Sequence, residues 1–170
     1  YSQTKLNNAI PLKEMGRFRH EAVAIDPKTS IAYQTEDRND GLIYRFLPKV
    51  KKQYWKGGQL EALIIKNVDT NDTRNWDEQI FVQNKEYDID WMALDHVDNP
   101  EDDMRIRAAE KGAAFFARPE GMWYDQNIVY FTCTSGGKKK LGQIWKMNLT
   151  RNTLELMFES HNSDALKACD

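Results

Sequence analysis

Two segments of this chain, about 100 residues apart, follow the same pattern of short apolar runs separated by turns. Tyr33-Gln-Thr35 corresponds to Tyr130-Phe-Thr132, and residues 41–46 correspond to residues 142–147. A repeating four-stranded unit of ~40–50 residues is typical of a β-propeller blade. The repeat therefore predicts an all-β fold that contains two blade-like units.

We place the first unit at residues 20–66 and the second at residues 119–159. Short runs of apolar and β-branched residues, bounded by Gly, Pro, Asn and Asp, indicate the strands. The expected strands of the first unit span 21–26, 31–36, 42–47 and 60–65, and those of the second span 122–124, 128–133, 142–147 and 154–158.

Residues 67–118 interrupt the repeat and form an irregular insertion that is polar and rich in turn residues. Residues 89–94 are expected to form a strand. The Ala-rich segment 104–117 predicts a short helix, although Gly112 is unfavourable within it.

Propellers close with ~4–8 blades, so two blades and an insertion cannot complete a ring. The chain also begins at Tyr1 and ends at Asp170 without a leader or a terminating element. We therefore expect residues 1–170 to be a single incomplete β-propeller domain and an internal fragment of a longer protein.

The composition excludes several other classes of protein. Hydrophobic residues make up 41% of the chain, so a packed core is expected rather than disorder. The 24 basic and 26 acidic residues leave a net charge of −2, whereas a nucleic-acid module usually has a basic excess. No apolar run approaches the ~18 residues of a membrane-spanning helix. Cys133 and Cys169 are too few for a disulfide scaffold.

Each unit opens with a glutamate, Glu21 in the first and Glu120 in the second. The first strands of propeller blades line the central channel, so these two side chains are expected to converge. Two carboxylates brought together repel each other unless a cation lies between them, and hard cations such as Ca²⁺ prefer oxygen ligands. The alternative is a plain one, because a glutamate before an apolar strand is usually a solvated strand end.

Further charged residues lie near these strand ends. Glu36 and Asp37 follow the second strand of the first unit, whereas Thr134-Ser135 stands at the matching place in the second. Arg118 precedes Glu120 by two residues, and a guanidinium can bind a phosphate or a carboxylate through two parallel hydrogen bonds. For Arg118 the alternative is a salt bridge to a neighbouring acid.

Four segments together resemble the PhoX-type alkaline phosphatase family, and they occur in that family's order. They are Gly16-Arg-Phe-Arg-His-Glu-Ala-Val-Ala24, Tyr33-Gln-Thr-Glu-Asp37, Ala117-Arg-Pro-Glu-Gly-Met-Trp-Tyr124 and Tyr130-Phe-Thr-Cys-Thr-Ser-Gly-Gly137. The resemblance implies a β-propeller that hydrolyses phosphate monoesters with a cluster of Ca²⁺ and Fe³⁺ at the channel mouth. It also implies export to the periplasm or beyond.

The resemblance implies roles for five residues. Glu21 corresponds to an iron ligand and Glu120 to a calcium ligand, while one of Glu36 and Asp37 corresponds to another calcium ligand. Arg118 corresponds to the catalytic arginine that holds the substrate phosphate. Family members usually carry Gly where this chain has Pro119, which fixes φ and changes how Arg118 is directed.

The family's remaining ligands are expected outside this chain, a cysteine before residue 1 and further acids after residue 170. We therefore expect these residues to be inactive alone. Two alternatives remain open: a catalytically silent propeller that serves as a binding scaffold, and another calcium-dependent propeller hydrolase such as a lactonase or a phytase.

Overall fold

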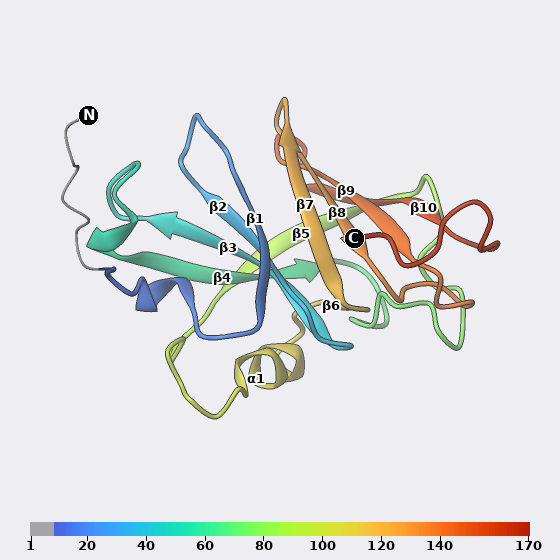
Figure 1. The fold of residues 1–170 in the computed structure, drawn as a ribbon, viewed down its shortest axis with the longest axis horizontal. Helices are drawn as coiled ribbons and strands as arrows, with labels where there is room; N and C mark the ends of the chain where they lie inside the picture. Colours follow the sequence, from blue (N-terminus) through green and yellow to red (C-terminus); the bar gives the residue numbers. More distant parts are fainter. Residues whose placement is uncertain (1–8) are drawn as a thin grey trace, which may run out of the picture.

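The computed structural model describes residues 9–170 and confirms the all-β prediction. Nearly all regular structure in this part of the chain is antiparallel sheet, with one α-helix and two short 3-10 helices (Figure 1). No helix among these residues is long and apolar enough to cross a membrane. The 3-10 helices are η1, Lys13–Met15, and η2, Tyr54–Lys56.

The first unit is an antiparallel meander of four strands, each paired with the next along the chain. Asp26 directly follows its first strand and accepts a hydrogen bond from the Lys28 amide at 2.9 Å, which favours the tight turn there. The strands are β1 (His20–Ile25), β2 (Ala32–Glu36), β3 (Gly41–Pro48) and β4 (Gly58–Ile65).

The second unit repeats this meander. Its first turn is made by Gln126 and Asn127, both at positive φ (46° and 68°), as a two-residue hairpin with the right-handed strand twist requires. The strands are β7 (Pro119–Asp125), β8 (Ile128–Cys133), β9 (Gln143–Asn148) and β10 (Thr153–Glu159).

The segment between the units contributes more to the sheet than an irregular insertion would. The strand expected near residues 89–94 is present as β5 (Glu86–Ala93), which pairs with β4 on one side and with β10 on the other. The helix α1 (Met104–Glu110) is shorter than the segment 104–117 predicted, because Gly112 takes a positive φ of 102° and ends it. The following β6 (Phe115–Phe116) pairs with β3.

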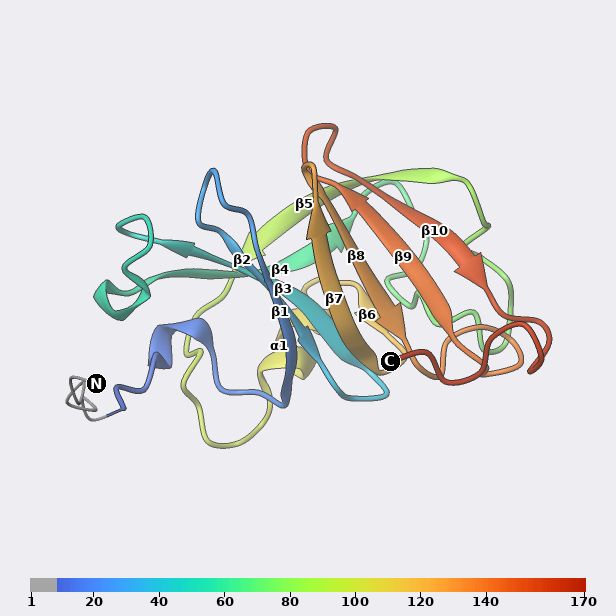
Figure 2. The ribbon, with the colours of Figure 1, turned by 45° about the horizontal axis from the view of Figure 1, so that its top comes forward.

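The strands of both units and β5 form one continuous order, β1-β2-β3-β4-β5-β10-β9-β8-β7. The two ends of this order, β1 and β7, lie side by side in both views, so the sheet is nearly closed (Figures 1 and 2). This arrangement is compatible with part of a propeller. It also brings the opening strands of the two units together.

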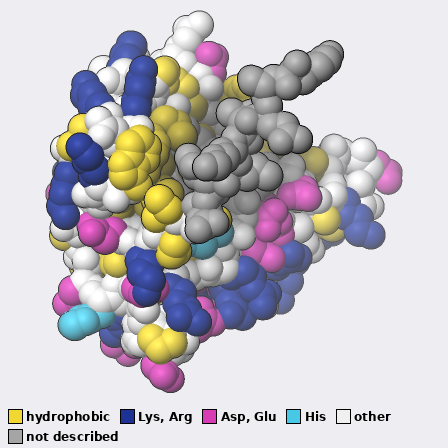
Figure 3. All heavy atoms as spheres, turned by 60° about the vertical axis from the view of Figure 1, so that its left-hand side comes forward, with side chains coloured by type: hydrophobic (Ala, Val, Ile, Leu, Met, Phe, Trp, Pro, Cys, Tyr) yellow, Lys and Arg dark blue, Asp and Glu magenta, His cyan; other side chains and the backbone are white. Residues whose placement is uncertain are grey.

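The hydrophobic core lies between the two units. Trp145 and Phe131 are buried and stack on each other, and Phe116 meets both rings edge to face. Cys133 belongs to this core, and burial raises the pKa of its thiol well above the ordinary value. A second cluster packs beneath α1 through Met104 and Ala108. On the face shown in Figure 3, acidic and basic side chains are interspersed.

Candidate functional site

The two opening strands carry a β-bulge at the same place. In β1 the register to β2 shifts between His20 and Val23, and in β7 the register to β8 shifts between Pro119 and Met122. Each bulge contains the glutamate of its unit. A bulge inserts an extra residue into a strand and redirects a side chain. The equivalent bulges therefore explain why the side chains of both glutamates depart from the usual alternation between the two faces of the sheet.

The glutamates of the two bulges meet a third carboxylate. Glu21, Asp37 and Glu120 each offer a carboxylate oxygen that lies within 4.8 Å of the other two. Glu120 is buried, Asp37 is half-buried and Glu21 is exposed, so the group opens to solvent on one side. We call these three residues the carboxylate trio. The sequence-based expectation that Glu21 and Glu120 converge is met in this geometry.

Arg118 forms ion pairs with two members of the carboxylate trio. Its Nε donates to Asp37 Oδ1 at 2.8 Å and its Nη2 donates to Glu120 Oε1 at 2.6 Å. The plain alternative, a salt bridge to a neighbouring acid, is therefore the arrangement present in this structure. The guanidinium remains 41% exposed at the side chain, so a solvent-borne anion can reach it.

The backbone of Arg118 is held firmly although its side chain is open. Its φ is 54°, an uncommon conformation for a bulky residue and more so for one that precedes proline. Its amide donates to Arg38 O at 2.9 Å, and its carbonyl accepts from the Thr134 amide at 3.0 Å. Such strained positions concentrate at functional sites, where the surrounding structure maintains them.

The charges in this site shift the pKa values in opposite directions. The hydrogen bond from Arg118 lowers the pKa of Asp37 below its usual range. Burial raises the pKa of Glu120, and the negative charge of Asp37 raises it further. Arg19 also acts on Asp37, and Asp170 acts on Glu120, so the acids outnumber the guanidinium groups around the site, an arrangement that favours an additional cation.

Glu36 lies apart from the carboxylate trio, although it is the direct neighbour of Asp37. It is fully buried and accepts hydrogen bonds from the Tyr44 hydroxyl at 2.7 Å and the Leu42 amide at 3.2 Å. Burial raises its pKa to about 7 against the effect of these bonds. Of the two acids that end β2, the structure therefore brings Asp37 to the glutamates.

The strand pairing corrects one detail of the repeat alignment. His20 pairs with Glu36 in the first unit, and Pro119 pairs with Cys133 in the second. Cys133-Thr134, rather than Thr134-Ser135, is therefore the match to Glu36-Asp37. The match of Tyr33-Gln-Thr35 to Tyr130-Phe-Thr132 leads to the same result, because Glu36 and Cys133 are the next residues along the chain.

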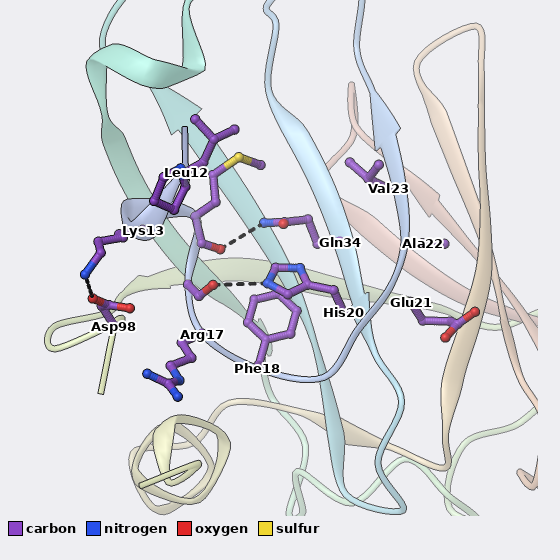
Figure 4. A pocket seen from close by; sticks show the side chains of 13 residues that line it. Leu12, Lys13, Arg17, Phe18, His20, Glu21, Ala22, Val23, Gln34 and Asp98 are labelled. Carbon is purple, nitrogen blue, oxygen red and sulfur yellow. Dashed lines mark hydrogen bonds and ion pairs between the residues drawn. The ribbon is translucent and has the colours of Figure 1, made fainter. Parts of the chain in front are cut away.

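A hollow of about 490 Å³ lies beside β1. In Figure 4, His20 turns into it, where its ring stacks on Phe18 and its Nε2 lies 3.0 Å from Gly16 O. Glu21 is one of the lining residues, but its side chain points to the other side of β1 (Figure 4). The hollow and the carboxylate trio are therefore on opposite sides of this strand, and we place the candidate site at the trio.

Sequence reasoning assigned no role to Thr35, which lies in the middle of the site. Its hydroxyl accepts from the Ala22 amide at 2.9 Å and donates to Glu120 O at 2.7 Å, and the residue is fully buried. The repeat makes Thr35 equivalent to Thr132, but this equivalence does not reveal the contact of Thr35 with the second unit.

Comparison with known proteins gives one match. A family model described as alkaline phosphatase PhoX matches residues 2–168, nearly the whole chain. No curated protein and no solved structure gives a significant match. The matched region contains both bulges, the carboxylate trio and Arg118, so the geometry and the match concern the same residues. This chain belongs to the PhoX alkaline phosphatase family.

Proposed function

We propose that this chain is part of a metal-dependent phosphatase that hydrolyses phosphate monoesters, with its metal site at the carboxylate trio. The observation that carries the proposal is the convergence of Glu21, Asp37 and Glu120 within 4.8 Å from separate strands. Membership of the PhoX family supplies the class of reaction.

The donor set fits hard cations. Carboxylate oxygens are the preferred ligands of Ca²⁺, and Fe³⁺, also a hard cation, accepts the same donors. We propose that Glu21 binds Fe³⁺ and that Glu120 and Asp37 bind Ca²⁺. The earlier candidate Glu36 is less suited, because it is fully buried away from the trio and its Oε2 already accepts hydrogen bonds from Tyr44 and Leu42.

The cysteine that the family resemblance implies as an iron ligand is not matched by either cysteine of this chain. Cys133 is fully buried, and burial raises the pKa of its thiol, which disfavours the thiolate that binds metals. Burial also raises the pKa of Cys169. We therefore propose that the chain supplies three carboxylate ligands and that further ligands come from outside it.

When bound, cations of this kind neutralise the negative charge of the phosphoryl oxygens. Arg118 would supply the second positive group, because its fork of N–H donors matches two phosphate oxygens. Those donors now engage Asp37 and Glu120. Asp37 and Glu120 would hold the cation, and Arg118, no longer needed as their partner, would be free to bind the substrate phosphate.

Residues 1–170 would then form one incomplete propeller domain with blade-like units at 20–66 and 119–159 and an insertion at 67–118. A closed propeller needs ~4–8 blades, so hydrolysis is expected from a longer protein that contains these residues and not from the chain alone. Following its family, we propose that this protein acts in the periplasm or outside the cell, on phosphate monoesters and with no nucleic-acid partner.

The test uses the longer protein and p-nitrophenyl phosphate. Elemental analysis of the purified protein is expected to find calcium and iron, and removal of the metals by a chelator is expected to abolish turnover. Added Ca²⁺ and Fe³⁺ should restore it. A protein that hydrolyses the ester equally well after complete loss of both metals would contradict the proposal.

One observation favours a second candidate, a catalytically silent binding scaffold. The unusual Pro119 follows an Arg118 whose guanidinium is already paired with two acids. A scaffold would contain no bound calcium or iron and would show no turnover. A third candidate, a calcium-dependent lactonase or phytase, would bind calcium but prefer its own substrate in a panel of lactones, phytate and simple phosphate esters.

A further inference from the structure

The two glutamates of the carboxylate trio stand on strands that are not paired with each other. β1 and β7 are the two ends of the sheet order, so no backbone ladder sets the distance between them. The separation of Glu21 and Glu120 must therefore be fixed by other contacts across this seam.

Thr35 makes such a contact. It lies on β2, directly opposite the bulge of β1. The β1–β2 register pairs His20 with Glu36 and Val23 with Gln34, which leaves Glu21 and Ala22 together facing Thr35. In place of the missing ladder bond, the Thr35 hydroxyl accepts a hydrogen bond from the Ala22 amide at 2.9 Å.

The same hydroxyl reaches the second unit. Thr35 Oγ1 lies 2.7 Å from Glu120 O, a good O–H···O distance, and 3.5 Å from Ala22 O, so its proton is donated to Glu120. One hydroxyl has one proton and two lone pairs, so it can hold both contacts at once. The residue is fully buried, so water does not replace either bond.

We propose that Thr35 is a positioning residue that ties the bulge of Glu21 to the backbone of Glu120 and thereby sets the geometry of the carboxylate trio. The inference rests on the proposed function for its metal-binding consequence. The contact of Thr35 with Ala22 and Glu120 is independent of the proposed function. Thr35 bonds to the Ala22 amide and the Glu120 carbonyl and to no carboxylate oxygen, so it acts through the two backbones.

The second unit contains a natural control. Thr132 stands at the equivalent place in β8, opposite the bulge between Pro119 and Met122. It is only half-buried, and its hydroxyl donates within its own unit, to Gly121 O at 3.4 Å. Thr132 thus shares the strand environment of Thr35 without the contact between units.

The test compares Thr35→Val, which keeps the shape and removes the hydroxyl, with Thr35→Ser, which keeps the hydroxyl, and with Thr132→Val. Two quantities are measured on the 170-residue chain: the exchange rate of the Ala22 amide by NMR, and the affinity for Tb³⁺ by luminescence titration. Thr35→Val is expected to speed Ala22 exchange about tenfold or more and to weaken Tb³⁺ binding about tenfold. Thr35→Ser and Thr132→Val should each stay within about twofold of the original chain.

Unchanged Ala22 exchange and unchanged Tb³⁺ affinity in Thr35→Val would overturn the inference while leaving the proposed metal site intact. If the original chain binds no Tb³⁺, the metal assignment fails, and the Ala22 exchange rates alone decide the role of Thr35. Should Thr35→Val not fold, Thr35→Ala is compared with Thr35→Ser, since the two differ only by the hydroxyl. Equal exchange rates in that pair would overturn the inference as well.

Discussion

The first and second units share a backbone, but the chemistry at the ends of their second strands differs. β2 ends in Glu36 and leads to Asp37, whereas β8 ends in Cys133 and leads to Thr134. Both strands bury their last residue, yet only the first unit delivers a carboxylate to the glutamates. The repeated backbone therefore fixes where side chains can meet, and the residue at one position decides whether they can hold a cation.

The two glutamates also differ in their surroundings. Glu21 is exposed, while Glu120 is buried and paired with Arg118. Equivalent bulges thus place one ligand at the solvent side of the site and the other on its inner side.

The largest effect is expected from removing either glutamate charge. In a longer protein that contains this chain, Glu21→Gln or Glu120→Gln should lower p-nitrophenyl phosphate turnover about 10²-fold or more, because the proposed cations would lose a ligand. Glu110→Gln, at an exposed position of α1, is the control and should leave turnover unchanged. Near-normal turnover in both glutamine variants would remove the metal assignment.

Replacing Arg118 should separate substrate binding from metal binding. Arg118→Gln is expected to lower turnover about 10²-fold through the loss of a phosphate contact. Its affinity for Tb³⁺ should increase, because the competing guanidinium no longer occupies Asp37 and Glu120. Arg151→Gln, which removes an ion pair to Glu86 elsewhere on the surface, serves as the control. Weaker Tb³⁺ binding by Arg118→Gln would show that the guanidinium supports the site rather than competing for it.

Asp37→Thr makes the first unit resemble the second, which has Thr134 at this place. With one of three carboxylates removed, the affinity for Tb³⁺ should fall about tenfold, or about 1.4 kcal/mol. Asp88→Thr changes an exposed aspartate of β5 in the same way and should have no effect on the titration. Equal affinities of the two variants would exclude Asp37 from the site.

The smallest effect is expected from replacing Asp26, which lies in the turn between β1 and β2. Asp26 accepts hydrogen bonds from the Lys28 amide, Thr29 and Tyr124, and these bonds outweigh its burial and lower its pKa. Its counterpart in the second unit, Asp125, is exposed.

Asp26→Asn should therefore reduce the free energy of unfolding at pH 7 by about 0.5–1 kcal/mol. The carboxylate's stabilising contribution is present above its unfolded pKa and is lost as the pH falls through the lowered folded value, so the difference should shrink in acid. Urea unfolding from pH 7 down to pH 3 measures this. Asp125→Asn, carried through the same series, should show little change, and an equal loss in both would contradict the assignment.

Local sequence patterns were sufficient for the strands, the repeat and the pair of opening glutamates, because period-two alternation and turn residues are local signals. The position of β5 between β4 and β10 was not predictable in this way, since it depends on pairing between residues far apart in the chain. The ion pairs of Arg118 depend on side-chain directions that its positive φ sets. Alignment of the repeat likewise could not reveal the contact of Thr35 across the seam.

The position of β5 has a mechanical consequence. Backbone ladders join the two units through β5 along one side. On the opposite side β1 and β7 are joined by side-chain contacts, by the Arg118 amide bonded to Arg38 O and by the short β3–β6 pair that precedes β7. Rotation about β5 as a hinge would separate the carboxylates and, among the ladders, would break the short pair of β3 with β6. A cation bound by both glutamates would therefore resist this rotation. Its binding would stabilise the closed form by RT ln(1 + [L]/Kd), where [L] is the free cation concentration and Kd is its dissociation constant.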